Sequence, residues 1–273
     1  MNINILLATY NGEEFLEQQL ESILSQTHTN WKLYIHDDNS TDNTDKTIKT
    51  YVKKFPNKII FLDDKVSFGN PSKNFMYLLE KIDGEYFMFC DQDDIWLPNK
   101  IELIFNKMKQ LEKTHSSHIP LLTFTDLKVI NANLEVINNS FWRYQKLNPC
   151  ISKNWKKLLA QNVITGCTIM INKKAKEICL PYELDTMVYD HWIGVNVSKY
   201  GQIGYLNHQT ILYRQHEHNT EGAKKFGLYY IFYKLKHIKK IISFQYTVSK
   251  YFKIISTIEL VYYKFTLNLI RFL

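Results

Sequence analysis

Cysteine is scarce in this chain of 273 residues, and the few thiols are poorly spaced for binding a metal. The four cysteines are Cys90, Cys150, Cys167 and Cys179, and no two of them form a Cys-x-x-Cys pair. This spacing argues against a zinc site or a disulfide framework. It favours reduced thiols in a cytosolic setting.

Glycine-rich phosphate loops are also missing. No Gly-x-Gly-x-x-Gly or P-loop sequence follows any apolar run. This absence argues against a cradle for a dinucleotide or for the phosphates of ATP. A bound diphosphate would therefore need a metal ion to balance its charge.

Two further absences concern membranes and export. No uninterrupted apolar run reaches the length of a membrane-spanning helix. The first residues, Met1 to Asn4, have no basic segment and lead directly into an apolar run, so we expect no secretory signal.

Charge is unevenly distributed along the chain. There are 34 Lys and Arg against 27 Asp and Glu, a formal net charge of +7. Residues 224–273 hold ten of the basic residues and one acidic residue, Glu259, which leaves 24 basic and 26 acidic residues elsewhere. We expect a slightly acidic globular domain over residues 1–222 and a basic, aromatic tail over residues 223–273.

Apolar runs alternate with helical periodicities in the first part of the chain. Short apolar runs predict strands at 4–9, 33–36, 58–62 and 86–89. Apolar residues at helical spacing predict helices at 13–25, 42–54 and 72–82. This alternation predicts an α/β fold with a mostly parallel, Rossmann-like sheet and flanking helices.

The second part of the chain shows a looser pattern. A helix is predicted from Pro98 to about residue 113, followed by a strand at 121–125 that ends at Asp126. Further predicted elements are a helix at 189–200, short strands at 203–206 and 210–213, and a polar loop at 214–219.

An acidic cluster follows the strand predicted at 86–89. Asp91, Asp93 and Asp94 lie within four positions, where open α/β sheets place their ligands. Carboxylates gathered at one point suit Mg²⁺ or Mn²⁺. The competing interpretation is a solvated acidic turn that caps the helix after Pro98.

Polar residues also follow the other predicted strands, at 9–11, at 37–38 and at Asp126. Because the ends of parallel strands share one edge of a sheet, we expect these groups to line one crevice. The sequence therefore predicts a binding site there.

Together these stretches resemble family 2 glycosyltransferases with the GT-A fold, over roughly residues 3–222. The segments that carry the resemblance are Thr9-Tyr10-Asn11, the run 37–42, Asp91-Gln92-Asp93-Asp94, Thr165-Gly166-Cys167, Tyr189-Asp190-His191-Trp192 and Tyr213-Arg214-Gln215-His216. The third and the last of these are most similar to the rhamnosyltransferase-like branch, which acts on bacterial surface polysaccharide.

The resemblance implies a nucleotide site. Thr9, Tyr10 and Asn11 would line a pocket for uracil or thymine, and the Asp38 carboxylate would accept the N3–H of the base. Asp91 would lie near the ribose. Asp38 has a competing role as a turn or cap residue. Lys73 would stand in for an arginine that some relatives have in the loop at 69–74.

The resemblance also implies a metal-assisted transfer. Asp93 would bind Mn²⁺ or Mg²⁺, with Asp91 near its water shell and His216 as an additional ligand. Asp190 would be the general base of an inverting reaction, and its competing role is an N-cap.

Further residues are expected at the donor or acceptor sugar. The resemblance assigns this place to Asp94, Thr165, Gly166, Cys167, His191, Trp192 and Arg214. Each has a simpler alternative. Asp94 would hold the loop, the segment 165–167 would be a strand-entry turn, Trp192 would be a core residue, and Arg214 would pair with a surface acid.

The tail interleaves lysine with aromatic residues at helical spacing, which is typical of amphipathic helices on an anionic membrane. The alternatives are packing on the body or on a second copy in a homodimer. A nucleic-acid partner is the least favoured, and we expect none.

The sequence therefore predicts an inverting, metal-dependent glycosyltransferase. It would move a sugar from a UDP- or dTDP-sugar to a glycan acceptor, which a lipid would anchor at the cytoplasmic face of the membrane. One rival is an aspartyl-phosphate phosphotransferase, but Thr9 stands where that class needs its nucleophile. The other is a non-catalytic sugar- or membrane-binding scaffold on the same fold.

Overall fold

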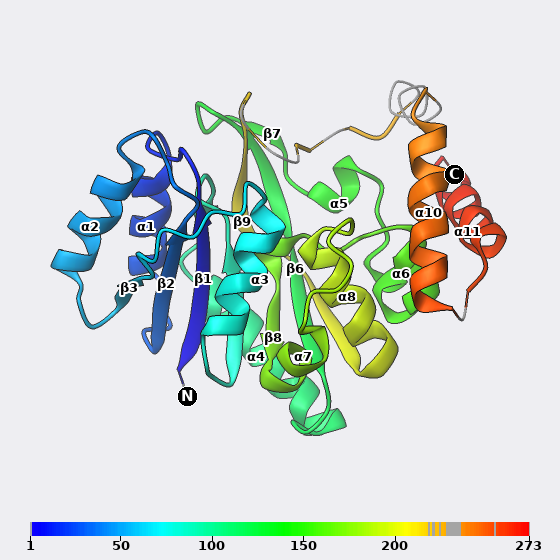
Figure 1. Cartoon of the computed structure of the whole chain (residues 1–273), viewed down its shortest axis with the longest axis horizontal. Helices are drawn as coiled ribbons and strands as arrows, with labels where there is room; N and C mark the ends of the chain where they lie inside the picture. The colour runs from blue at the N-terminus through cyan, green and yellow to red at the C-terminus, as the bar shows by residue number, and fades with distance from the viewer. Residues whose placement is uncertain are drawn as a thin grey trace.

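The structure is a computed structural model (Figure 1), and it describes residues 2–217, 219, 222–223, 225–227, 236–253 and 255–272. Residues 228–235 of the predicted tail, which include its aromatic residues between 229 and 233, lie outside the described residues.

The first half of the chain forms the predicted parallel sheet. Its strands are β1 (Ile3–Thr9), β2 (Trp31–Asp37), β3 (Ile59–Phe61) and β4 (Tyr86–Cys90), in the order β3-β2-β1-β4. The helices between them are α1 (Leu16–Leu24), α2 (Thr44–Lys54) and α3 (Pro71–Lys81). Each predicted element is present, with boundaries shifted by a few residues.

The second half of the sheet is mixed. β8 (Met170–Asn172) is antiparallel to both β4 and β6 (Leu121–Asn131), whereas β9 (Gln202–Gln215) is parallel to β6. The short strands β5 (Ile95–Trp96) and β7 (Val136–Asn138) pair antiparallel with β9 and β6 respectively.

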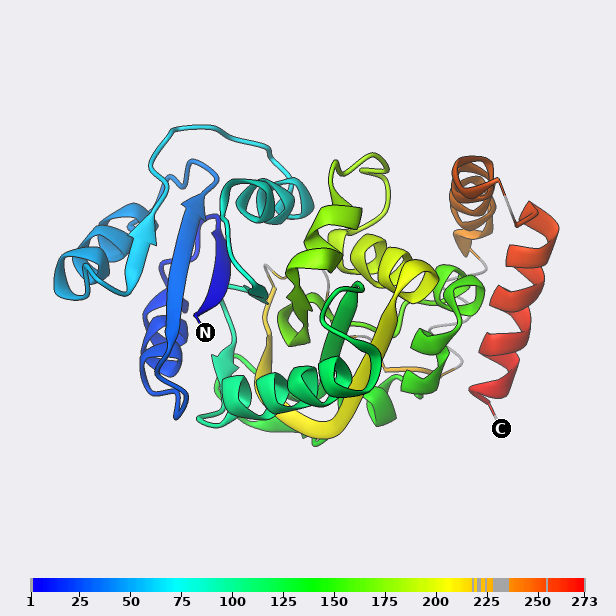
Figure 2. The same cartoon turned by 90° about the horizontal axis from the view of Figure 1, so that it is seen from below.

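Helices cover both faces of the sheet (Figures 1 and 2). One layer contains α3, α7 (Lys173–Cys179) and α8 (Tyr189–Tyr200), and the other contains α1 and α4 (Lys100–His115). Alternate side chains of β1 pack against the two helical layers. Leu6 belongs to the core cluster on the side of α3, α7 and α8, and Ile5 and Leu7 belong to the cluster on the side of α1 and α4. A sheet buried on both faces leaves its strand ends as the place for a site.

Short helices lie between β7 and β8 in the chain. They are α5 (Phe141–Tyr144), the 3₁₀ helix η1 (Pro149–Lys153), α6 (Trp155–Ala160) and the 3₁₀ helix η2 (Gly166–Thr168).

Two predictions about the second half are wrong. β6 does not end at Asp126, whose fully buried carboxylate accepts hydrogen bonds from Ser140 Oγ and from Trp142 N at 3.1 Å. Asp126 thus organises α5 rather than the crevice. The two short strands predicted at 203–206 and 210–213 are one strand, β9, which ends at Gln215 and so includes two residues expected in a loop.

The described tail forms two helices, α10 (Ile238–Phe252) and α11 (Thr257–Ile270), at one end of the molecule (Figure 1). Their inner sides pack on the body: Lys264 Nζ donates to Ala160 O at 2.8 Å, and the rings of Trp155 and Phe252 lie 6.0 Å apart. Within the described ranges, no helix has the length and apolar character that crossing a bilayer requires.

Candidate functional site

The ends of β1, β2 and β4 meet at one edge of the sheet, as the sequence predicts. β1 lies between the other two, with Thr9 opposite Asp37 and Leu7 opposite Cys90. The residues that follow these strands are therefore neighbours.

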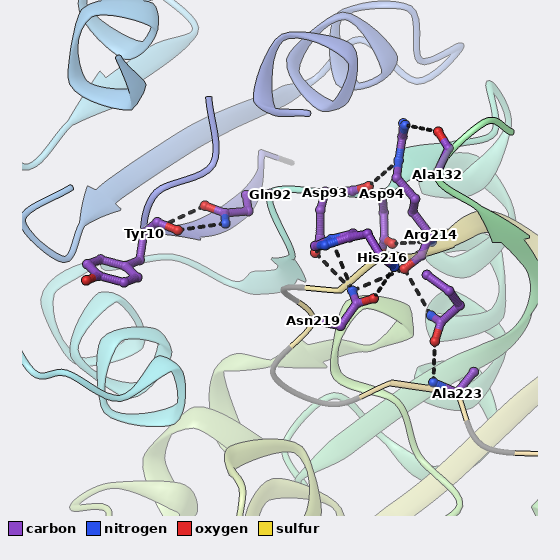
Figure 3. A network of polar contacts seen from close by, with 10 residues as sticks. Tyr10, Gln92, Asp93, Asp94, Ala132, Arg214, His216, Asn219 and Ala223 are labelled. Carbon is purple, nitrogen blue, oxygen red and sulfur yellow. Dashed lines mark hydrogen bonds and ion pairs between the residues drawn. The ribbon is translucent and has the colours of Figure 1, made fainter. Parts of the chain in front are cut away.

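The turn after β1 is joined to the acidic segment after β4. Tyr10 N donates to Gln92 Oε1 at 2.8 Å, and Gln92 Nε2 donates to Tyr10 O at 2.9 Å (Figure 3). Gly12 permits this contact, because a Cβ there would lie 2.4 Å from Gln92 Oε1. Asn11, in the left-handed region at φ 46°, donates its N–H to Ser40 Oγ. The Tyr10 ring is left exposed.

The turn after β2 holds Asp38 in a nearly buried position. Asp38 N donates to Thr9 O at 2.9 Å, and Asp38 Oδ1 accepts a hydrogen bond from Phe68 N. Among the described residues, Asp38 Oδ2 has no such donor. Thr9 is fully buried and donates its hydroxyl to Asp37 Oδ1, so only its backbone and methyl group border the turn.

Lys73 lies in the first turn of α3. Its ammonium pairs with Asp185 Oδ2 at 2.9 Å, and both side chains are exposed. An exposed pair of this kind is weak enough to be exchanged for a ligand phosphate.

The acidic segment after β4 concentrates charge. The ligand atoms of Asp91, Asp94 and Cys167 lie within 4.8 Å of one another. Burial, followed by repulsion from Asp93 and Asp190, raises the pKa of Asp91 to about 7. Burial also raises the pKa of Asp94 well above its usual range, with Asp93 and Asp91 adding to the effect.

Asp94 is fully buried and has two different oxygens. Oδ1 accepts a hydrogen bond from Arg214 N at 3.1 Å, whereas Oδ2 has no hydrogen-bond partner among the described residues. The structure therefore favours the alternative in which Asp94 holds the loop.

Asp93 meets a residue from the far end of the domain. Asp93 Oδ2 lies 2.8 Å from His216 Nε2 and 3.3 Å from Asn219 Nδ2 (Figure 3). The His216 ring packs on Phe15, with centroids 4.7 Å apart. Two predicted metal ligands, 123 positions apart, are thus brought together.

Arg214 lies behind this pair instead of in an open loop. Its Nε donates to Asp93 O at 2.9 Å and its Nη1 to Ala132 O at 3.3 Å (Figure 3). The guanidinium lies 4.4 Å from the centre of the Phe15 ring, and the side chain is 2% exposed. These contacts place Arg214 as a brace for the acidic segment rather than as a clamp open to a ligand.

Asp190, in the first turn of α8, is held by two donors. Gly166 N donates to Asp190 Oδ2 at 3.0 Å, and Asn162 Nδ2 donates to Asp190 Oδ1 at 3.1 Å. Position 166 must be glycine for the turn to fit, because a Cβ would lie 1.9 Å from Tyr189 Oη. Asp190 is only half-buried, and its charge contributes to the raised pKa of Asp91. The two carboxylates therefore share one site.

Two further residues at or next to η2 differ in burial. Cys167 is fully buried, and burial raises the pKa of its thiol well above the usual range, so the thiol stays neutral. Thr165 is half-buried, and its carbonyl accepts the N–H of Thr168.

His191 and Trp192 differ from the prediction, because the structure places both in the core. Trp192 Nε1 donates to Cys179 O at 2.8 Å, and the ring packs against Tyr251 of α10. His191 Nε2 lies 2.8 Å from Leu158 O, and burial lowers the pKa of the ring to about 4. On α8 the side chains that follow Asp190 turn inward, toward helices that are distant in the sequence.

Besides Asn219, which lies beside Asp93, the prediction missed three polar residues of the site. Gln92 ties two strand ends together, Asn162 orients Asp190, and Lys100 is fully buried beneath the acidic segment. Gln92 stands inside the acidic motif and could have been noticed there. Lys100 and Asn162 carry no signal in the sequence, because their roles depend on partners 67 and 28 positions away.

The residues present fit a hard divalent cation. Asp93 Oδ2 lies beside His216 Nε2, and the charge of Asp93 helps to raise the pKa of the nearby Asp91. Two carboxylates and an imidazole are a donor set that Mn²⁺ accepts and that Mg²⁺ accepts in part. Like charges crowd the site, and Asp94 Oδ2 is buried without a hydrogen-bond partner among the described residues. A cation would relieve this repulsion.

Residues 4–179 match the family model described as Glycosyl transferase family 2. The chain is 32% identical to dTDP-rhamnosyl transferase RfbG of Shigella flexneri over 227 residues. The aligned region covers 80% of this chain and 74% of that protein. It is 27% identical, over 138 residues, to UDP-Glc:alpha-D-GlcNAc-diphosphoundecaprenol beta-1,3-glucosyltransferase WfgD of Escherichia coli, covering 50% of this chain and 47% of that protein.

A solved structure shares the fold. Mannosyltransferase PcManGT from Pyrobaculum calidifontis, in complex with GDP-Man and Mn²⁺, superposes with a TM-score of 0.58 at 12% identity, over 91% of this chain and 64% of that one. This likeness confirms the predicted α/β architecture.

Proposed function

The chain belongs to glycosyl transferase family 2, and from this premise we propose that it is an inverting, metal-dependent glycosyltransferase of bacterial surface polysaccharide synthesis. Its donor would be a UDP- or dTDP-sugar, and its acceptor a lipid-linked glycan at the cytoplasmic face of the membrane. The names of RfbG and WfgD support this class of donor, and the name of WfgD supports this class of acceptor.

One observation carries the proposal. The half-buried carboxylate of Asp190, oriented by Gly166 N, lies close enough to Asp91 to raise its pKa. A group suited to accept a proton therefore faces a group suited to hold the donor, which is the arrangement that transfer between two substrates requires.

The nucleotide would bind across the ends of β1 and β2. Asp38 Oδ2 would accept the N3–H of uracil or thymine, which a cytosine lacks. The exposed Tyr10 ring would lie against the base, and Asp91 would bond to the ribose. Lys73 would exchange Asp185 for a phosphate of the donor.

A cation held by Asp93 and His216, with Asp91 near its water shell, would neutralise charge on the departing diphosphate. Asp190 would accept the proton of the acceptor hydroxyl while that oxygen forms a bond to C1 of the sugar. The bond from C1 to the diphosphate oxygen breaks, and its electron pair leaves with the diphosphate. Attack from the face opposite the leaving group inverts the configuration at C1.

We expect nucleotides to stabilise the protein selectively. UDP or dTDP at about one hundred times its Kd should add about 2.7 kcal/mol to the free energy of unfolding in Mn²⁺, and much less in EDTA. The measurement is thermal unfolding with UDP, dTDP, GDP or ADP in each condition. If no nucleotide raises the melting temperature of the wild type, the non-catalytic scaffold is favoured. If one does, the nucleotide that stabilises more strongly, UDP or dTDP, identifies the base of the donor.

The outer sides of α10 and α11 support peripheral membrane binding. Large apolar side chains are exposed there, including Ile258 at 83%, Phe265 at 68% and Tyr262 at 63%. Lys239 and Lys240 lie exposed near the start of α10. A pair of helices that exposes both apolar groups and lysines suits a surface of anionic lipid, to which each lysine adds about 1 kcal/mol.

We expect Tyr262→Ser combined with Phe265→Ser to weaken binding to vesicles that contain anionic lipid, with little change in melting temperature, because both side chains are exposed. The measurement is co-sedimentation with phosphatidylglycerol vesicles. Val136→Ser, at an exposed apolar position on β7, is the control and should bind like the wild type. Equal binding by the double variant, or a dimer that the variant dissociates, would contradict the membrane proposal.

A further inference from the structure

Lys100, the first residue of α4, is a buried cation with few partners. The side chain is 0% exposed, and its Nζ donates to Cys167 O at 2.9 Å. The ammonium also lies 4.4 Å from the centre of the Trp96 ring. A lysine ammonium has three donors, and this one has a single hydrogen-bond acceptor in the part of the chain that the structure describes. Burying it this way is costly unless negative charge lies nearby.

That negative charge comes from the acidic segment. Burial lowers the pKa of Lys100 to about 8, and electrostatic interactions oppose this effect, first with Cys167 and Cys90 and then with Asp94 and Asp91. A methionine would fill the same volume without the desolvation cost. Packing alone therefore does not explain a lysine at this position.

Lys100 is connected to Asp190 through the η2 turn. Cys167, whose carbonyl accepts the Lys100 hydrogen bond, belongs to η2, and Gly166 of the same turn donates its N–H to Asp190 Oδ2. One ammonium thus contacts the short turn that orients the proposed base while its charge faces the proposed donor site.

We propose that Lys100 is a positioning residue that joins the donor site to the catalytic base. Its charge balances Asp91 and Asp94, and its hydrogen bond holds the turn that aims Asp190 at the acceptor. This proposal rests on the proposed function, because it assigns Asp190 the role of base.

Two opposite changes are expected in Lys100→Met. Without the competing cation, the acidic segment should bind Mn²⁺ more tightly, with Kd lowered about threefold or more. Without the hydrogen bond from Lys100, the η2 turn should hold Asp190 less precisely. We expect kcat to fall roughly 10²-fold, as for a displacement of a catalytic group by about 1 Å. The variant should fold, because Mn²⁺ can supply the missing positive charge.

The experiment measures Mn²⁺ affinity by titration calorimetry, melting temperature in Mn²⁺ and in EDTA, and sugar transfer. Lys113→Met, at an exposed position of the same helix, is the matched control and should behave like the wild type. Lys100→Gln removes the charge but keeps a donor, so it should bind Mn²⁺ as tightly as Lys100→Met while keeping more of kcat.

Three results would overturn the proposal. Weaker Mn²⁺ binding together with lower kcat in Lys100→Met would indicate a general structural role. Transfer within threefold of the wild type would show that Asp190 does not depend on Lys100. Failure of both variants to fold in Mn²⁺ would make the residue a stability element. A wild type that binds Mn²⁺ but transfers no sugar would instead count against the proposed function.

Discussion

Asp190→Asn is expected to lower kcat by about 10²–10⁴-fold, the usual contribution of a general base. Asparagine keeps the size of the side chain and can still accept the hydrogen bond from Gly166 N, but it cannot take up a proton at neutral pH. Donor binding should be largely retained. The measurement is release of nucleoside diphosphate in the presence of acceptor, together with thermal shift by UDP or dTDP.

The control separates catalysis from helix stabilisation. Asp45 occupies the first turn of α2, as Asp190 does in α8, and it lies outside the proposed site. Asp45→Asn should cost only about 0.3–1 kcal/mol in stability through the helix dipole and leave kcat unchanged. If Asp190→Asn shows the same small effect, Asp190 is a helix-terminal residue and the base lies elsewhere.

Asp93→Ala is expected to abolish the stabilisation by nucleotide that depends on Mn²⁺. The substitution removes a proposed ligand of the cation and leaves His216 without its carboxylate partner at 2.8 Å. The wild-type gain of about 2.7 kcal/mol at one hundred times Kd should fall to near zero. The measurement is thermal unfolding with UDP or dTDP in Mn²⁺ and in EDTA.

Two companions sharpen this test. His216→Ala should lose part of the same stabilisation, and the double variant should lose no more than Asp93→Ala alone, because both groups act through one cation. Asp63→Ala, which within the described part of the chain breaks only exposed ion pairs with Lys49 and Lys65, should respond to nucleotide like the wild type. If Asp93→Ala keeps the full stabilisation by nucleotide in Mn²⁺, the cation is bound by Asp91 and Asp94 instead of Asp93.

The local sequence determined most of the first half of the fold. The run at 86–89 forms a buried strand because its side chains are apolar on both faces of the strand. The acidic residues that follow it therefore lie at the edge of the sheet. The helix at 72–82 likewise begins where Asn70 accepts the N–H of Lys73. These features depend on neighbours a few positions away, so pattern and propensity suffice to predict them.

The tertiary structure decided which polar groups meet. His216 reaches Asp93 only because β9 continues unbroken to Gln215, and Arg214 turns inward because Ala132 and Phe15 lie beside it. A strand pattern in the sequence does not say how far a strand extends once it has a partner to pair with.

The same limit explains the misplaced residues near Asp190. Trp192 belongs to the core because α10 covers it, and Lys100 is buried because the η2 turn and Trp96 close over it. Burial is a property of the partner surface, which comes from segments far along the chain. The sequence by itself thus determined the strand-end acids and the family they resemble. Only packing decided whether each side chain faces a substrate, a metal or the core, because those contacts are not local.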